Sequence, residues 1–373
     1  MSGYRIFAIN PGSTSTKVAL FEGAESVFSQ NIEHDAETLK TFPDISDQLP
    51  YREKNILDAL ATAGLSLAGM DAFVGRGGGL VSLEGGTYEV NETLLGHARV
   101  GFTVKHPAIL GSQLAHKFAE TYGGAAYVVN PPDVDELDEI ARVSGLADCP
   151  RESRIHALNQ KEVGIRCAAD LGKRYEECNF VISHIGGGVS VTAHRRGRMV
   201  DSNDIINGDG PMAPTRAGSI AGTALVKQCF SGEYTEKEMY ARITKNGGIV
   251  DHLGTADVRE VVRRIESGDD YARLVYQAMA YQIGKNIGAY AAVLEGDVDA
   301  IVLTGGIAND EAFVARISQM VGSIAPVRVY AGEFEMEALA AGATRVLDGV
   351  EEPKVYTGVP VWSGFDRSGV TGE

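Results

Sequence analysis

The sequence lacks the features that mark several large classes of protein. It has only four cysteines in 373 residues, and none of them forms a Cys-x-x-Cys pair or a zinc-like spacing with histidine. A disulfide framework and a structural zinc site are therefore not expected, and the cysteines fit free thiols in a reducing cytoplasm. No uncharged apolar stretch reaches the roughly 18 residues of a transmembrane helix, and the first residues show no signal-peptide pattern. We expect a cytoplasmic protein that does not enter a membrane.

Positive charge is scarce and dispersed. The chain has 34 lysines and arginines against 50 acidic residues, which gives a formal net charge of −16. Proteins that coat nucleic acid or an anionic membrane usually present a basic face. The densest basic group, Arg195–Arg196 with Arg198, is typical of a solvated hairpin turn. We expect no nucleic-acid partner, and an anionic substrate would need a locally positive site.

The Walker A pattern GxxxxGK[ST] is also missing, which excludes a P-loop. The segment NPGSTSTK, Asn10–Lys17, first suggests one. Its lysine, however, lies on an outgoing strand and not at the start of a helix, so a helix dipole cannot bind phosphate there. The glycine turn and the four hydroxyl side chains of residues 13–16 can instead surround phosphate oxygens from a hairpin.

What the sequence does contain is an alternation of strand-like and helix-like segments, which predicts an α/β protein. Its length fits two domains. The strand-like runs are 4–9, 17–22, 72–74, 126–129, 180–184, 189–194, 300–304 and 327–330. The helix-like runs are 51–63, 108–121, 158–175, 235–243, 256–267, 270–294 and 334–347. The run 270–294 is apolar nearly all round, which leaves open a helix buried in its own domain or a subunit interface.

An internal repeat is the most informative pattern. IFAINPGSTSTKVALFEG at 6–23 aligns with FVISHIGGGVSVTAHRRG at 180–197, as a hairpin with a glycine-bearing turn. DAFVGRGG at 71–78 matches DAIVLTGG at 299–306 at five of eight positions. Both pairs occur in the same order. We therefore predict two copies of one α/β unit, 1–150 and 151–349, with a tail at 350–373 that returns to the first, and a site between them.

Arginines at turns are the strongest candidates for binding an anion. Arg76 lies in VGRGGG and Arg216 in PTRAGS, among glycines and prolines and away from helix faces. A guanidinium grips carboxylate or phosphate with two parallel hydrogen bonds. The triple glycine after His184 would turn backbone N–H groups towards an anion, and the Gly305–Gly306 turn would let a flat group such as adenine lie on the backbone.

These motifs resemble the acetate/butyrate kinase family. The segments that carry the resemblance are INPGSTSTK, HALNQK, HIGGGVS, GDGPMAPTRAGS, GTADVREV and VLTGGIA, and they span nearly the whole chain. Acetate kinases usually read N-C-G-S-S-S at the first loop and H-L-G-N-G at the second, so the butyrate branch is the better match. The resemblance implies two duplicated ribonuclease H-like domains that face each other across an active-site cleft, as in sugar kinases and actin-like ATPases.

The resemblance also implies a reaction: ATP and butanoate give ADP and butanoyl phosphate, reversibly and with Mg²⁺. The carboxylate and the transferring phosphoryl would be held by Arg76 and Arg216, with His184 and His156 as active-site histidines and His106 on the substrate side. The residues that match the phosphate and nucleotide site are Asn10, Ser13, Ser15, Lys17, Gly186, Gly187, Gly188, Asp257, Arg259, Gly305 and Gly306. The residues near the metal would be Asn10 and Glu335, with Glu337 as the alternative to Glu335.

One position departs from the family. Where its strand usually ends in aspartate, this chain has Asn130, in VVNPPDVDE. Asparagine keeps the shape of aspartate and loses its charge, so metal binding would depend on Asp133, Asp135 or Glu335.

Other functions remain open. The acid could be acetate, propionate or isobutyrate, because pocket volume decides the substrate. A non-catalytic actin-like nucleotide-binding protein would have no carboxylate for the two arginines. A sugar kinase would need an aspartate base, and Asn130 occupies the position where such an aspartate is expected. If the run 270–294 is an interface, the protein is a homo-oligomer, a dimer or larger.

Overall fold

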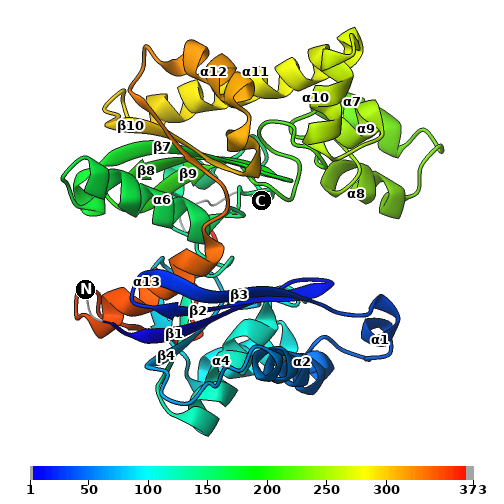
Figure 1. Cartoon of the computed structure of the whole chain (residues 1–373). Coiled ribbons are helices and arrows are strands. Elements are labelled where there is room, and N and C mark those ends of the chain that lie inside the picture. Colours follow the sequence, from blue (N-terminus) through cyan, green and yellow to red (C-terminus); the bar gives the residue numbers. More distant parts are fainter. Residues whose placement is uncertain (1–2, 367–373) are drawn as a thin grey trace. The chain divides into compact units, whose positions relative to one another are not determined.

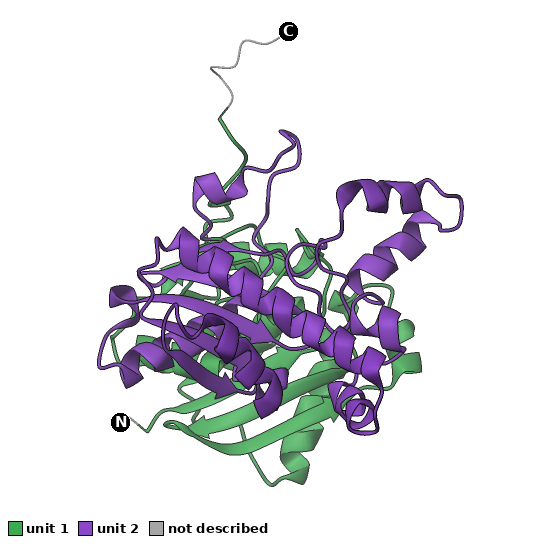
Figure 2. Ribbon diagram, turned by 90° about the horizontal axis from the view of Figure 1, so that it is seen from above, with its two compact units in different colours: residues 1–135, 335–373 green, residues 136–334 purple. Residues whose placement is uncertain are grey.

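The chain forms two compact units. The computed structural model describes residues 3–366, and its contacts divide the chain into residues 1–135 with 335–373, and residues 136–334 (Figure 2). The change of unit therefore falls after Asp135 and not near residue 150, and the chain returns at Glu335 and not near 350. The first boundary lies after Asp135 because residues 136–142 form hydrogen bonds with the second unit. The Glu136 carboxylate, for example, accepts a hydrogen bond from the backbone N–H of Met199.

The first unit is built on a seven-stranded sheet with the order β12-β5-β6-β4-β1-β2-β3. The central strands β1, β4 and β6 are parallel, and β1, β2 and β3 form an antiparallel meander. The strands are β1 (Arg5–Pro11), β2 (Ser15–Glu22), β3 (Glu25–Glu33), β4 (Ala72–Gly75), β5 (Thr87–Glu89), β6 (Ala125–Val129) and β12 (Lys354–Val355).

Helices cover both faces of this sheet (Figure 1). Helices α2 and α4 pack on one face, where Phe7, Ile9 and Phe73 form a buried cluster with side chains of both helices. Helix α13 contacts β1, β4 and β6 from the other face. The helices of this unit are α1 (Ala36–Lys40), α2 (Leu49–Thr62), α3 (Glu92–Val100), α4 (Ile109–Tyr122) and α13 (Glu335–Leu347).

The second unit is built on a five-stranded sheet with the order β11-β10-β7-β8-β9. Strands β7, β10 and β11 are parallel, and β7, β8 and β9 form an antiparallel meander. Strand alternation sends Phe180 and Ile182 to the face under α6, and Val181 and Ile185 to the face under α11. The strands are β7 (Asn179–Ile185), β8 (Val189–Arg195), β9 (Arg198–Ser202), β10 (Ala300–Gly305) and β11 (Val327–Ala331).

Several helices of this unit begin at an aspartate cap, as at Asp257, Asp269 and Asp310, whose carboxylates accept backbone N–H bonds of the first turn. The helices are α5 (Glu139–Arg142), α6 (Ala157–Asp170), α7 (Gly222–Cys229), α8 (Glu236–Thr244), α9 (Ile249–Leu253), α10 (Val258–Glu266), α11 (Asp270–Val293) and α12 (Glu311–Val321). No helix within residues 3–366 is both long enough and apolar enough to cross a bilayer.

The two sheets share one strand plan, which confirms the repeat predicted from the sequence. Strands β1, β2, β3, β4 and β6 have the same order and directions as β7, β8, β9, β10 and β11. The aligned segments fall on equivalent elements, the β1–β2 and β7–β8 hairpins and strands β4 and β10.

The predicted strands and helices are all present, with small shifts at their ends. The largest shift is in α6, which ends at Asp170, because Gly172 takes a positive φ of 70° and terminates the helix. Strands β3 and β9 were among the elements not predicted from the sequence. Strand β3 is a largely exposed edge strand, so it shows no clear apolar alternation.

Helix α11 is apolar on more than one side, but only one side is buried. Val275, Met279 and Ile283 pack into the core of the second unit, while Leu274 and Tyr281 are 62% and 51% exposed. The helix is therefore buried within its own domain along one face. The homo-oligomer stays a prediction.

Candidate active site

In the first unit the predicted phosphate loop joins β1 to β2. Asn10 and Lys17 are direct partners in the antiparallel register, so their side chains lie on the same face together with Ser15. Ser13 and Lys17 are exposed, whereas Thr16 is completely buried. The hydroxyl of Thr16 therefore turns into the domain, and three of the four hydroxyl side chains of the loop remain for a ligand.

A buried arginine that was not predicted from the sequence lies beneath this loop. The Arg52 guanidinium is fully buried and donates from Nη1 to the carbonyls of Gly12 (2.9 Å) and Ser15 (3.0 Å). Its Nε and Nη2 donate to Gln48 Oε1 at 3.1 and 2.9 Å. Within residues 3–366 no carboxylate pairs with it. Burial lowers the pKa of Arg52 to about 10, so it is still charged near neutrality. Arg52 thus holds the loop in shape and places a positive charge under it.

Replacing Arg52 by methionine should lower the free energy of unfolding by about 3 kcal/mol, because several buried oxygens lose their donor. The Michaelis constant for a nucleotide should rise as the loop loosens. Chemical denaturation and steady-state kinetics measure the two effects. Lys54→Met on the same helix is the control: Lys54 is exposed and, among the residues that the structure describes, pairs only with Asp58, so stability should change by less than about 0.5 kcal/mol. Equal stability losses in the two variants would contradict this role for Arg52.

His34 also supports the loop. Its backbone N–H donates to the Thr14 carbonyl, and its ring contacts Thr16 Oγ1 through Nε2 and Asn55 through Nδ1. Burial, and then the charge of Arg52, lowers the pKa of His34 from 6.5 to about 4. The folded protein therefore keeps this ring neutral at pH values where the unfolded chain protonates it.

Stability should consequently fall as the pH is lowered from 6.5 towards 4, because the unfolded state binds the additional proton in this window. The contribution of His34 is about 3 kcal/mol at the acid end. His34→Gln keeps a hydrogen-bonding side chain without the titration, so its stability should decline less over this window in urea unfolding at stepped pH. His116→Gln, on α4, should decline like the wild type. A His34→Gln curve parallel to the wild type would refute this assignment.

Glu335 connects the loop to Arg76. It is the first residue of α13, and its Oε2 accepts a hydrogen bond from Asn10 Nδ2 at 2.6 Å. Its Oε1 lies 3.7 Å from Nη2 of Arg76, which directly follows β4. Glu337 is exposed and points away from this face, since two residues along a helix turn the side chain by about 200°. Of the two glutamates, Glu335 is the one that contacts Asn10 and Arg76.

The other two residues of interest in the first unit take different positions. His106 is exposed overall and precedes α4. Partial desolvation of its ring, and then the charges of Arg76 and Arg52, lower its pKa. Asn130 is buried at a positive φ of 39°, a conformation that asparagine tolerates well. Its Oδ1 accepts a hydrogen bond from the Gly86 N–H at 2.7 Å, so this side chain ties two loops together.

In the second unit Arg216 lies directly on the β7–β8 turn. A Cβ atom added at Gly188 would stand 1.8 Å from Nη1 of Arg216, so only glycine leaves room for this guanidinium. The turn is closed by the Gly186 N–H, which donates to the Gly188 carbonyl at 3.1 Å. Thr215, next to Arg216, donates to the Gly187 carbonyl at 3.0 Å. Arg216 and the triple-glycine turn therefore form one assembly.

The two predicted histidines of this unit are neighbours. The rings of His156 and His184 stack with their centroids 4.0 Å apart and their planes inclined by 23°. Nδ1 of His184 lies 3.0 Å from Oδ1 of Asn159, and Nδ1 of His156 lies 2.8 Å from Oγ of Ser190. His184 is 5% exposed at the end of β7, so the ring is held firmly beside the glycine turn.

The predicted nucleotide residues fall into two groups. Gly305 lies beside the end of β7, since a Cβ there would meet the Ile185 carbonyl at 2.4 Å, and Gly306 follows it. Asp257 and Arg259 lie at the start of α10 and bond to each other through two contacts of 2.9 Å. Arg259 is 88% exposed, so this pair contributes little to stability. Within the described residues, no hydrogen bond or ion pair joins Asp257 or Arg259 to the other predicted residues of the second unit.

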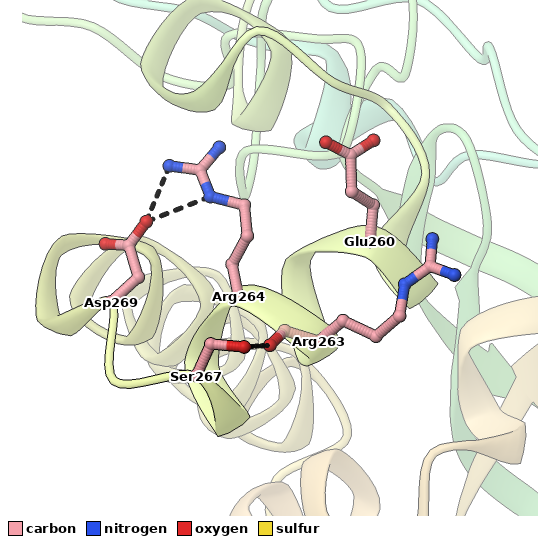
Figure 3. Close-up of a pocket in the computed structure, with 5 residues that line it drawn as sticks. All are labelled: Glu260, Arg263, Arg264, Ser267 and Asp269. Carbon is pink, nitrogen blue, oxygen red and sulfur yellow. Dashed lines mark hydrogen bonds and ion pairs between the residues drawn. The ribbon is translucent and has the colours of Figure 1, made fainter.

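A pocket of about 240 Å³ opens at the other end of α10 (Figure 3). Arg264 donates to Asp269 at 2.6 and 2.9 Å, and Arg263 and Glu260 complete a wall with balanced charge. The pocket therefore offers no strongly positive site for an anion. No group of three or more His, Cys, Asp or Glu side chains within residues 3–366 is placed to hold a metal ion.

Each unit thus gathers several of its predicted residues, around the loop in one and around the triple-glycine turn in the other, while Asp257 and Arg259 lie apart from the second group. Solved structures share the fold. The acetate kinase of Porphyromonas gingivalis matches 92% of this chain and all of its own length, with a TM-score of 0.77 at 19% identity. A propionate kinase from Francisella tularensis subsp. tularensis SCHU S4 matches 90% of this chain and 98% of its own, with a TM-score of 0.68 at 17% identity. The architecture is the duplicated ribonuclease H-like α/β fold.

Sequence relatives define the family. The model of the acetokinase family matches residues 151–330. A protein of Clostridium botulinum (strain Alaska E43 / Type E3) described as a probable butyrate kinase is 45% identical over 353 residues, which are 95% of this chain and 99% of the relative. The chain belongs to the acetokinase family.

Proposed function

We propose that this protein is a butyrate kinase, which transfers the γ-phosphoryl group of ATP to the carboxylate of butanoate and gives ADP and butanoyl phosphate, reversibly. The observation that carries the proposal is that Arg76 and Arg216 each hold one buried Nη1 with no hydrogen-bond partner among the described residues. Buried donors without an acceptor are rare and costly. An anionic substrate would supply the missing acceptors, and the 45% identity to a probable butyrate kinase favours this choice of acid.

Phosphoryl transfer asks the protein mainly for positioning and for neutralisation of charge on the transferring group. A carboxylate acceptor is already ionised near pH 7, so no general base is needed. In our proposal Arg216, Arg76 and His184 bind the developing charge, and His156 adds a hydrogen bond. His106 orients the carboxylate. On the nucleotide side, the proposed ligands are Ser13, Ser15, Lys17, Gly186, Gly187, Gly188, Asp257, Arg259, Gly305 and Gly306.

Mg²⁺ is part of the proposal. Asn10 and Glu335 bring an amide oxygen and a carboxylate to one place in the first unit, joined by the 2.6 Å hydrogen bond. Such hard oxygen donors suit Mg²⁺, which keeps water and phosphate oxygens as most of its ligands. When bound, the cation would neutralise phosphate charge. Asn130 is not among the proposed ligands, because its Oδ1 is bonded to Gly86.

A hydroxylamine trap for acyl phosphate tests the proposal. The purified protein is incubated with ATP, Mg²⁺ and each of acetate, propionate, butanoate, isobutyrate and valerate, and the hydroxamate is measured. We expect butanoate to give the highest kcat/KM. A higher value with another acid would keep the kinase and change its substrate. No hydroxamate with any acid, from a protein that still binds ATP, would refute the kinase and favour a non-catalytic nucleotide-binding protein.

A further inference from the structure

A chain of buried polar groups runs through the second unit to His156. Tyr175 Oη lies 2.5 Å from His194 Nδ1, and His194 Nε2 lies 2.9 Å from Gln160 Oε1. Gln160 Nε2 then donates to Ser190 Oγ at 2.7 Å, and Ser190 Oγ lies 2.8 Å from His156 Nδ1. His194, Gln160 and Ser190 are fully buried. Because these three side chains are buried away from water, each of their donors must find an acceptor among the neighbouring protein groups.

The donor and the acceptor of each hydrogen bond in this series can be assigned from one backbone carbonyl. Gln160 Nε2 also lies 3.2 Å from the carbonyl oxygen of Ser190, which can only accept a hydrogen bond. The amide nitrogen of Gln160 must therefore face Ser190, and its oxygen must face His194. His194 Nε2 consequently carries the proton. Burial, and then the charge of Lys161, holds the pKa of His194 well below its usual range, so the ring is neutral and its Nδ1 accepts from Tyr175.

The same reasoning assigns the donor and the acceptor in the hydrogen bond between Ser190 and His156. The Ser190 hydroxyl accepts the Gln160 N–H, so its own proton remains to be donated. The partner that lies 2.8 Å away is Nδ1 of His156. A nitrogen that accepts this hydrogen bond carries no proton, so the proton of a neutral His156 ring lies on Nε2.

We infer that Gln160 and Ser190 are positioning residues that hold His156 as its neutral Nε2–H tautomer, and thereby as a hydrogen-bond donor. What His156 donates to, the transferring phosphoryl group, rests on the proposed function. The stack with His184 disfavours protonation of both rings at once, because two charged rings with centroids 4.0 Å apart would repel each other.

The tautomer can be measured without any substrate. Long-range ¹H–¹⁵N correlation spectra of the unliganded, ¹⁵N-histidine-labelled protein distinguish protonated from unprotonated ring nitrogens. The His156 signals are identified by their loss in His156→Gln. We expect an unprotonated Nδ1 and a protonated Nε2 for His156 near pH 7.5. A protonated Nδ1 would overturn the inference, whatever the enzyme does with butanoate.

Ser190→Ala tests the link between Ser190 and the tautomer. Its His156 spectrum should lose the fixed pattern and average the two tautomers, and kcat should fall about tenfold with KM for butanoate changed less than twofold. Thr192→Val is the matched control. Thr192 lies two residues along the same strand, is equally buried, and bonds to Ser202 Oγ at 2.8 Å and not to a histidine.

The control should keep the wild-type His156 spectrum and at least half of the wild-type kcat. Ser190→Thr retains the hydroxyl and should recover most of both. A wild-type tautomer in Ser190→Ala, or equal losses in Ser190→Ala and Thr192→Val, would overturn the role of Ser190. Should Ser190→Ala fail to fold, the spectrum of the wild type still decides the inference. Absence of kinase activity with every acid would refute the proposed function, but it would not affect the result of the tautomer measurement.

Discussion

Arg216→Ala is expected to lower kcat by about 10²–10³, the usual loss when one preorganised donor to a transition state is removed. The fold should persist, because this guanidinium makes no side-chain hydrogen bond within the described residues and its Nη1 is buried without a partner. Burial also lowers the pKa of Arg216, which shows that its charge is poorly compensated before a ligand binds. Losing such a charge costs the folded state little. Hydroxamate kinetics and thermal unfolding measure the two effects.

Arg316→Ala is the control for this variant. Arg316 is an exposed arginine on α12 that donates a 3.2 Å hydrogen bond to Gln319, so its loss should leave kcat within about twofold. If Arg216→Ala keeps more than about a tenth of the wild-type rate, Arg216 does not bind the transferring group.

Gly188→Ala should lower kcat nearly as much as Arg216→Ala does, although this substitution replaces no charged residue. The new methyl group would stand 1.8 Å from Nη1 and 2.8 Å from Cζ of Arg216, and the nearest atoms it meets all belong to that side chain. A flexible side chain moves more easily than backbone, so Arg216 should be displaced while the fold is kept. We expect kcat to fall about 10²-fold, as after removal of a donor, with little change in thermal unfolding.

A double variant sharpens this prediction. If Gly188→Ala acts by displacing Arg216, adding it to Arg216→Ala should cost almost nothing more. Gly288→Ala is the control, because a Cβ at this position in α11 meets no atom within 4 Å. It should leave kcat unchanged and slightly stabilise the helix. Additive losses in the double variant, or a normal kcat in Gly188→Ala, would contradict the assembly of Arg216 on the glycine turn.

The repeat could be predicted because it rests on local patterns. A short, mostly apolar strand, a glycine turn and a second strand are legible in Ile6–Gly23 and again in Phe180–Gly197. Strand β3 escaped detection because an exposed edge strand has little apolar pattern to show. Arg52 escaped because an arginine in an amphipathic helix gives no sign that it faces inward. The clue available was its place among Leu49, Ile56 and Leu60 on one helical face.

The link from Gln160 to His156 could not be predicted for a related reason. His156 is the residue that caps the start of α6 and Gln160 lies four residues further along, so their proximity is legible from helical spacing. Ser190 and His194 join them from β8, and only the packing of α6 on that sheet sets which atoms meet. Asn130 shows the same limit, since the sequence suggested a lost metal ligand and the structure shows a bond to Gly86.

The sequence by itself determined the α/β class, the duplication, the absence of a P-loop and the candidate loops, because these depend on the order of residues within short segments. Only the tertiary structure decided which long-range partners meet. Glu335 reaches Asn10 across 325 residues of chain, Arg52 lies under the phosphate loop, and Arg216 covers Gly188. Such contacts depend on how helices and strands pack, and packing is settled by the whole core at once and not by any one segment.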